Sequence, residues 1–419
     1  MRPAGRIEPQ PWLTAPETRA VVAALTAEGA VVRFVGGGVR DAVLGRPLTD
    51  LDIATPDPPE RVIRLLEAAG IRVVPTGIDH GTVTAVIPPR HFEITTLRRD
   101  VETFGRRARV AFTDDWAADA ARRDFTINAL FCDPDGTLYD PVGGLADLRA
   151  GRVRFVGDPE TRIREDVLRL LRFFRFHAYY GRGEPDPKAL AACRRMASAL
   201  PRLSAERVAG ELLRLLAAPD PALVLALMIE IGALAHWLPE ASDLTALPEL
   251  CRIEAGGPDA IRRLALIVRR GGGDGETVGR RLRLSVARIK RLAALVAPAV
   301  ALPPELDARA RRRLLYRLGR DRFVDLVLLA WAEALAADPA REPALAAAYG
   351  AMLDDARGWR PPRFPLGGDD VLARGVPPGP RVGALLSAVE AWWIAGDFQA
   401  DRAALQARLA ALARAEAAS

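Results

Sequence analysis

The chain has 419 residues, of which 50% are hydrophobic and 27% are charged. That composition excludes a largely disordered chain and predicts a globular protein with a sizeable core and about two to four domains. The formal net charge of +6 favours a polyanionic partner.

The three cysteines, Cys132, Cys193 and Cys251, stand far apart in the sequence and form no zinc-binding spacing. Free thiols of this kind indicate a reducing compartment. The first residues include no apolar stretch of signal-peptide length, and no run of about 18 apolar residues predicts a membrane-spanning helix. We therefore expect a cytoplasmic protein without a membrane partner.

Up to about residue 150 the sequence alternates between strand and helix patterns. Apolar and β-branched residues predict strands at residues 30–37, 50–55, 81–88 and 91–100, and a hairpin at 131–140 that turns at Asp135-Gly136. Glycine-ended helices are predicted at residues 39–45 and 59–70, the second opened by Pro59. Residues 97–116 are charged and lack apolar periodicity, which predicts a mobile loop.

Beyond residue 150 the strand pattern fades, and a sequence rich in Ala, Leu and Arg predicts helices as far as Ser419. The pattern predicts one long helix over residues 161–181. Residues 204–218 predict another, with Ser204 at its N-cap and Glu206 in its first turn. Breaks rich in glycine or proline follow at 269–279 and 357–370, and no fixed-period repeat is present.

Two aspartates, Asp50 and Asp52, stand one residue apart in a predicted strand. Side chains at alternate strand positions point to the same face, with backbones about 6.6 Å apart, so these carboxylates repel unless a cation lies between them. Magnesium binds one or two carboxylates together with substrate phosphates. The alternative, a pair of solvated surface aspartates, stays open on this pattern alone.

A glycine turn, Gly36-Gly37-Gly38, lies between a predicted strand and a predicted helix. Backbone N–H groups and the positive end of a helix dipole at such a turn favour an anion. Arg40 in the first helical turn opposes that dipole, so it needs another anion, which a triphosphate would supply. The spacing excludes a dinucleotide-binding fingerprint, because Asp41 stands where its third glycine belongs, and no Gly-Lys-Ser/Thr follows to form a Walker A loop.

A third carboxylate, Glu93, lies in a predicted strand between Phe92 and Ile94 and therefore faces away from their side. It is a candidate metal ligand or base only if its strand lies beside the strand of Asp50 and Asp52. Otherwise it is an exposed glutamate.

Five sequence motifs follow in order: VGGGVRD (35–41), DLD (50–52), RRDFTINAL (122–130), DPVGGLADL (140–148) and EDVLRLLRFFRF (165–176). Together they resemble the bacterial-type tRNA nucleotidyltransferases, the CCA-adding enzymes that share a family with bacterial poly(A) polymerases. The resemblance covers roughly residues 31 to 240, and beyond 240 only the helical character matches.

The resemblance implies an α+β fold, in which a polymerase-beta-type nucleotidyltransferase head with a mixed sheet precedes an all-helical neck, body and tail. The expected parts are an N-terminal helical segment (1–30), the head (31–150), a neck with a base-recognition helix (151–218), an RNA-binding body (219–330) and a tail (331–419). The implied substrates are tRNA, CTP and ATP, and the implied cofactor is Mg²⁺.

The resemblance also implies roles for individual residues. Asp50 and Asp52 match the metal ligands, and Glu93 matches a third acidic position at the catalytic site. The other matching positions bind the nucleotide: Gly37, Gly38, Arg40, Arg123, Asp166, Arg169, Arg172 and Arg175. The mobile loop at residues 97–116 helps such enzymes to switch from CTP to ATP, which favours full CCA addition.

In this family the Asp and Arg of the EDVLR segment read the base edge, and their chemistry fits that role. On a helix, Asp166 and Arg169 are i, i+3 neighbours. A carboxylate only accepts hydrogen bonds and a guanidinium only donates them. Cytosine and adenine each present an amino donor beside a ring-nitrogen acceptor, whereas guanine and uracil present the reverse order. The alternative is an ordinary salt-bridged helix with a Glu165–Arg169 pair.

Several alternatives share these motifs. A poly(A) polymerase has the same head, although residues 77–96 resemble the tRNA enzymes more, and a CC-adding or A-adding specialist also fits. An intact Asp-x-Asp argues against a silent RNA-binding protein, and about 200 further helical residues argue against a small-molecule nucleotidyltransferase. Arginines at 279–292 and 308–322 either contact RNA phosphates or simply coat the helix surfaces.

Overall fold

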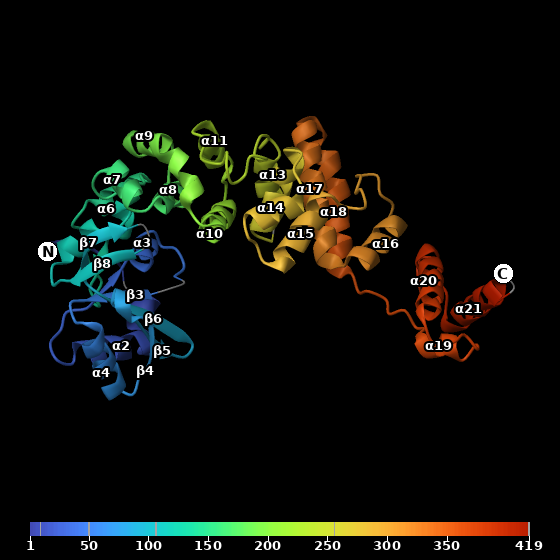
Figure 1. The fold of residues 1–419 in the computed structure, drawn as a ribbon, viewed down its shortest axis with the longest axis horizontal. Helices are drawn as coiled ribbons and strands as arrows, with labels where there is room; N and C mark the ends of the chain where they lie inside the picture. Colours follow the sequence, from blue (N-terminus) through green and yellow to red (C-terminus); the bar gives the residue numbers. More distant parts are fainter. Residues whose placement is uncertain (9, 49–50, 105–106, 255, 418–419) are drawn as a thin grey trace. The chain divides into compact units, whose positions relative to one another are not determined.

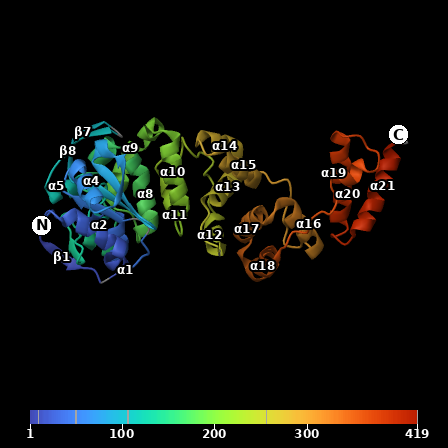
Figure 2. The same ribbon diagram turned by 90° about the horizontal axis from the view of Figure 1, so that it is seen from below.

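The computed structural model describes residues 1–419 except 9, 49–50, 105–106, 255 and 418–419 (Figure 1). The chain divides into two compact units: Met1–Pro239 with Arg281–Leu284, and Glu240–Arg280 with Ser285–Ser419. Among the described residues, the strands all belong to the first unit, as both views of the ribbon show (Figure 1, Figure 2).

The first unit is built on a mixed sheet in the order β1-β10-β9-β2-β3-β6-β5-β4. Its strands are β1 (Pro3–Arg6), β2 (Arg33–Val35), β3 (Leu51–Thr55), β4 (Arg72–Gly77), β5 (Thr82–Ile87), β6 (Arg90–Thr96), β9 (Phe131–Cys132) and β10 (Thr137–Tyr139). Neighbouring strands run antiparallel except β3 and β6, which are parallel. The sheet therefore joins two strands that are far apart in the sequence.

The predicted strands are confirmed as β2, β3, β5 and β6, and the predicted hairpin as β9 and β10. Gly136 at the hairpin turn has a φ of 92°, a conformation that glycine adopts without strain. The sequence patterns do not predict β1 or β4. β1 pairs with β10, so the N-terminal segment contributes a strand to the sheet as well as helices.

Helices cover both faces of the sheet. On one face, α4 (Pro59–Ala68) packs on β4 to β6 and on α2 (Pro16–Thr26), and Trp12 of α1 (Pro11–Thr14) contacts the ring of Phe34 edge-on. On the other face, Ala120 of α5 (Trp116–Ala121) joins a buried cluster of Val35, Ala54, Leu97, Ala129, Phe131 and Val156. The helices predicted at 39–45 and 59–70 are confirmed as α3 (Gly37–Val43) and α4.

Residues 97–116 do not form the predicted loop. They contain β7 (Arg98–Phe104) and β8 (Arg107–Phe112), which pair with each other as a separate two-stranded antiparallel sheet (Figure 1). Backbone hydrogen bonds between the two strands hold this ribbon together. The loop is predicted from side-chain periodicity, which carries no information on backbone hydrogen bonds, so the prediction is wrong.

The long helix predicted over 161–181 is interrupted. α7 (Pro159–Glu165) and α8 (Leu168–Tyr180) are separated at Asp166, whose φ of −149° and ψ of 108° are extended. The Asp166 carboxylate accepts the backbone N–H of Leu168 at 3.1 Å and a hydrogen bond from Arg207 at 2.7 Å. An aspartate that satisfies the first N–H groups of a new helix stabilises such a break.

The helices that follow the sheet in the chain pack around α8. α8 contacts α7, α9, α10 and α11. Ser204 precedes α10 as predicted, but its side chain makes no capping hydrogen bond. The remaining helices of this unit are η1 (Ile78–His80), η2 (Thr126–Asn128), α6 (Gly144–Ala150), α9 (Pro187–Met196), η3 (Ala197–Arg202), α10 (Ala205–Leu216) and α11 (Ala222–Glu230).

The second unit consists of helices, with α13, α15 and α17 in mutual contact and a further core around Trp393 near the C-terminus. Within the described residues, no helix is long and apolar enough to cross a membrane. The helices are α12 (Leu247–Ile253), α13 (Ala260–Arg270), α14 (Gly275–Arg281), α15 (Val286–Val296), α16 (Ala308–Leu318), α17 (Arg320–Ala337), η4 (Pro339–Arg341), α18 (Glu342–Gly358), α19 (Gly368–Leu372), α20 (Pro380–Ala395) and α21 (Arg402–Ala417).

Candidate active site

Two of the predicted carboxylates lie side by side on the sheet. β3 and β6 pair in parallel with Asp52 opposite Glu93, so the two side chains share one face on strands about 4.8 Å apart. Their neighbours Ile53 and Ile94 are buried on the opposite face, whereas Asp52 is half-buried and Glu93 is exposed. The condition under which Glu93 is a candidate, that its strand lies beside the strand of Asp52, is therefore met. Asp50 lies outside the described residues.

This donor set fits a hard divalent cation, because carboxylate oxygens on a common face are the ligands that magnesium prefers. Repulsion between two carboxylates on adjacent strands also makes a cation favourable there. In the described part of the chain, no group of three or more His, Cys, Asp and Glu side chains is arranged to hold a metal ion.

The glycine turn lies directly against this face. Gly36 has a φ of 74°, which favours glycine, and Gly37 and Gly38 begin α3. A Cβ placed on Gly36 would lie 3.6 Å from Nη1 of Arg123 and 3.6 Å from a carboxylate oxygen of Asp52. The turn, the arginine and the aspartate thus converge on one point.

Arg40 is already paired with an anion. Its guanidinium is buried and donates to the Asp41 carboxylate at 3.0 and 2.9 Å and to Oδ1 of Asn128 at 2.6 Å. It also stacks 4.1 Å from the ring centroid of Tyr180 in α8. The neighbouring carboxylate is therefore the anion that the sequence argument required for Arg40, so that argument no longer calls for a triphosphate, and nucleotide binding by Arg40 stays a prediction.

Arg123 is held by a buried carboxylate. Its Nε and Nη2 donate to Oδ2 of Asp119 at 3.2 and 2.9 Å, and Arg122 donates to Oδ1 of the same residue. Burial alone would raise the pKa of Asp119, but the charges of Arg123 and then Arg122 outweigh it, so that pKa lies below its ordinary value. Asp119 is an ionised anchor, and Nη1 of Arg123 is directed toward Gly36.

Asp124, the next residue, pairs with the neck instead. Arg172 of α8 donates to its Oδ2 at 2.8 and 2.5 Å. Burial raises the pKa of Asp124, yet the Arg172 charge and the hydrogen bonds keep that pKa below its usual range. Arg175 donates in turn to Glu211 of α10 at 2.6 Å. Arg172 and Arg175 therefore brace the contact between α8, the head and α10.

Asp166 and Arg169 do not have the geometry predicted for them. Asp166 lies in the break rather than on a helix, and its carboxylate accepts from Arg207. Arg169, in the first turn of α8, donates to Glu165 and, at 3.2 Å, to the backbone oxygen of Arg162. The Glu165–Arg169 ion pair, which is the alternative interpretation of this segment, is present.

Sequence reasoning missed three partners that organise the site: Asp119, Arg207 and Glu211. Two of them, Asp119 and Arg207, had a local signal. Asp119 stands four residues before Arg123, a spacing at which side chains meet on a helix. Arg207 occupies the third helical position of α10, where a capping glutamate is usual.

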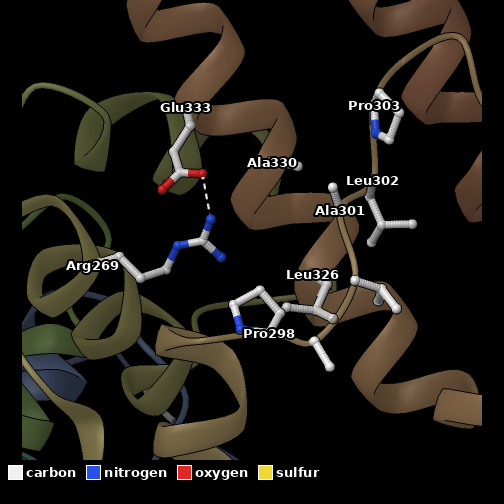
Figure 3. A pocket seen from close by; sticks show the side chains of 10 residues that line it. Arg269, Pro298, Ala301, Leu302, Pro303, Leu326, Ala330 and Glu333 are labelled. Atoms are coloured by element: carbon white, nitrogen blue, oxygen red, sulfur yellow. Dashed lines mark hydrogen bonds and ion pairs between the residues drawn. The ribbon is translucent and has the colours of Figure 1, made fainter.

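A pocket of about 420 Å³ lies elsewhere, in the second unit. It is lined by residues 298–303, Leu326 and an ion pair in which Arg269 donates to Glu333 at 2.8 Å (Figure 3). None of the residues predicted for the site lines it, so this cavity is separate from the chemistry considered above.

Two family models match the chain, one within the first unit and one that extends a few residues into the second. The model described as "Poly A polymerase head domain" matches residues 32–154, which include the glycine turn and the strands of the main sheet other than β1. The model described as "Probable RNA and SrmB- binding site of polymerase A" matches residues 184–244.

Relatives and solved structures resemble the chain over most of its length. "CCA tRNA nucleotidyltransferase 1, mitochondrial" of Danio rerio is 34% identical over 394 residues, 88% of this chain and 85% of the relative. The "CCA-adding enzyme" of Lacticaseibacillus paracasei is 40% identical over 247 residues, 58% of this chain and 61% of the relative. The crystal structure of Bacillus stearothermophilus CCA-adding enzyme in complex with CTP matches with a TM-score of 0.75 and 26% identity, covering 98% of this chain and 99% of that one.

Proposed function

The chain belongs to the family of CCA-adding tRNA nucleotidyltransferases, and on that basis we propose that it adds CCA to the 3′ end of tRNA from CTP and ATP, releasing pyrophosphate. The observation that carries the proposal is the in-register pairing of Asp52 with Glu93 beside Gly36 and Arg123. Carboxylates for a cation, together with a guanidinium for phosphate, are what nucleotidyl transfer requires.

Enzymes of this kind generally use a divalent metal ion, and we propose Mg²⁺ held by Asp52 and Asp50, with Glu93 as a further acidic group on the same sheet face. When bound, the ion neutralises the triphosphate and lowers the pKa of the attacking tRNA hydroxyl. The protein's own part is to fix the carboxylates on adjacent strands, so that little rearrangement is needed when the substrates arrive.

Arg123 is the guanidinium best placed for the triphosphate. Asp119 holds it through Nε and Nη2, which leaves Nη1 directed toward Gly36. The backbone N–H groups of Gly37 and Gly38 are proposed to contact the same phosphates. Arg40 is proposed to act indirectly, without contacting the phosphates. It is paired with Asp41 and holds the glycine turn against Tyr180 of the neck.

Asp166 and Arg169 are proposed to read the base edge, with Arg172 and Arg175 as supports behind them. Asp166 is oriented by Arg207 and Arg169 by Glu165. Wrong bases would not match the donors and acceptors that these half-buried groups present to the base, and unmatched buried polar atoms carry a large penalty.

We propose that catalysis lies in the head (31–150) and neck (151–218), and that the body (219–330) and tail (331–419) hold the tRNA. The cytoplasmic location expected from the sequence is also a proposal, since the relatives from Danio rerio, Mus musculus and Homo sapiens are named as mitochondrial.

The test is to incubate the protein with tRNAs that end before CCA or after CC, and with oligo(A), supplying each nucleotide singly and together. Three residues added to the shorter tRNA, and one A to the longer, are the expected products. A long adenylate tail on any RNA would instead identify a poly(A) polymerase. Addition that stops after CC would identify a CC-adding enzyme, and addition of A only to tRNA that already ends in CC would identify an A-adding enzyme.

A further inference from the structure

Asp119 links Arg123, which lies at the candidate active site, to the start of the β7–β8 hairpin. Its Oδ2 accepts both hydrogen bonds from Arg123, and its Oδ1 accepts from Arg122 and, at 3.3 Å, from the backbone N–H of Arg98. The side chain is only 1% exposed. A buried carboxylate with this many donors is fixed in orientation, because every displaced hydrogen bond would leave a buried polar group unpaired.

Arg98 is the first residue of β7, so Asp119 binds the foot of the β7–β8 hairpin, which consists of Leu97, Arg98 and Thr113, where the hairpin begins and ends. The residue before it, Leu97, donates to the backbone oxygen of Thr55 at 2.8 Å and accepts from the N–H of Thr113 at 3.0 Å. These bonds close the hairpin at the end of β3, the strand that carries Asp52. The guanidinium of Arg98 also donates to the backbone oxygen of His80.

The other end of the linkage lies at the candidate active site. Nη1 of Arg123 and the Asp52 carboxylate both lie 3.6 Å from the Cβ position of Gly36. A phosphate drawn to Arg123 would pull on Oδ2 of Asp119, and a rigid carboxylate cannot move one oxygen without moving the other.

We propose that Asp119 is a positioning residue that couples Arg123 to the foot of the β7–β8 hairpin, so that nucleotide binding at Arg123 stabilises the hydrogen bonds of that foot. The inference rests on the proposed function, because it takes the ligand of Arg123 to be a nucleoside triphosphate.

The variant that tests it is Asp119→Asn, which keeps the size but leaves one accepting oxygen, so that Arg123 and Arg98 can no longer both be served. The KM for CTP and for ATP should rise about tenfold or more, as expected for a lost charge-assisted hydrogen bond, with a smaller change in kcat and an unchanged KM for tRNA. The matched control is Asp115→Ala, which removes the N-cap of the same helix, where Asp115 accepts from Ala117 at 2.8 Å, without touching Arg123 or Arg98.

Hydrogen exchange supplies a measurement that would not change if Asp119 had only a structural role. In the wild type, CTP with Mg²⁺ should slow amide exchange in the peptide covering residues 97–104, and in Asp119→Asn that protection should be lost. If Asp119→Asn does not fold, the wild-type exchange decides alone. The inference is overturned if the nucleotide leaves that peptide unchanged, or if Asp119→Asn and Asp115→Ala alter both KM values alike. A wild type inactive on every RNA would instead overturn the proposed function.

Discussion

Arg40, Arg123 and Arg172 each have a guanidinium that is already paired with a carboxylate. The pairs differ in what they leave available. Arg123 uses two nitrogens on Asp119 and directs the third toward the glycine turn, whereas Arg40 is occupied on all three by Asp41 and Asn128. Residue type and spacing could predict that these arginines matter, but not which would face a ligand, because that depends on partners up to 88 residues away.

Asp52→Asn should abolish nucleotide incorporation, because an amide is a poor ligand for a divalent cation. We expect a loss of at least roughly a thousandfold, in the upper range for a lost electrostatic contact at an active site. Binding of tRNA, measured by gel shift, should be unchanged. The control is Glu67→Gln on the exposed side of α4; comparable activity in the two variants would contradict the assignment of Asp52.

Arg172→Met should destabilise the fold by about 3 kcal/mol at pH 7, because it leaves the mostly buried Asp124 carboxylate without its charged partner. The pKa of Asp124 is depressed in the folded state, so the pair stabilises the fold above the ordinary aspartate pKa of about 4. That stabilisation is lost as the pH falls through the lower, folded value. Melting curves from pH 7 to pH 3 should therefore show the gap between wild type and variant narrowing in acid, and a constant gap would exclude this origin.

At the scale of the element, two features escape sequence patterns. The apolar spacing of 161–181 continues through Asp166, so periodicity predicts one helix, and only the Arg207 and Leu168 contacts explain the break. The parallel pairing of β3 with β6 is likewise invisible in sequence order. By contrast, the glycine ends of α3 and α4 and the hairpin turn at Gly136 follow from local chemistry and are confirmed.

Arg207→Met should loosen the break between α7 and α8 by releasing Asp166, and so weaken base discrimination. We expect the ratio of CTP to UTP incorporation to fall about tenfold, the lower end for loss of a hydrogen-bonded recognition contact. Arg214→Met is the matched control on the same helix, with a side chain 60% exposed. If both variants keep wild-type selectivity, Asp166 does not depend on Arg207 for its role.

At the scale of the whole molecule, the resemblance predicts the order of the parts, a mixed sheet followed by helices. It does not predict which arginines of the second unit hold helices together and which are exposed, and only the structure separates these two groups. Arg309 and Arg313 donate to backbone oxygens at the end of α20, and Arg312 pairs with Asp397, so these three hold α16 to α20. Arg320 and Arg322, at the start of α17, are exposed. Arg309, Arg312 and Arg313 therefore have a structural role, and contact of Arg320 and Arg322 with RNA phosphates stays a prediction.

The double variant Arg320→Glu/Arg322→Glu should raise the KM for tRNA and leave the KM for CTP and the melting temperature unchanged. The slope of log affinity for tRNA against log salt should fall by about one to two, as for the loss of one or two phosphate contacts. Arg312→Ala should do the opposite, lowering stability with little effect on the salt slope. An unchanged slope in the double variant would place the RNA elsewhere.

Arg123 and Asp124 are adjacent in the chain, yet one is bound to the helix before it and the other to the neck. Substitutions one position apart should therefore produce unlike phenotypes, a defect in nucleotide use at 123 and a heat-sensitive fold at 124. A mutational scan read only by growth would merge them into a single intolerant block, and scoring thermal tolerance alongside turnover would separate the two neighbours.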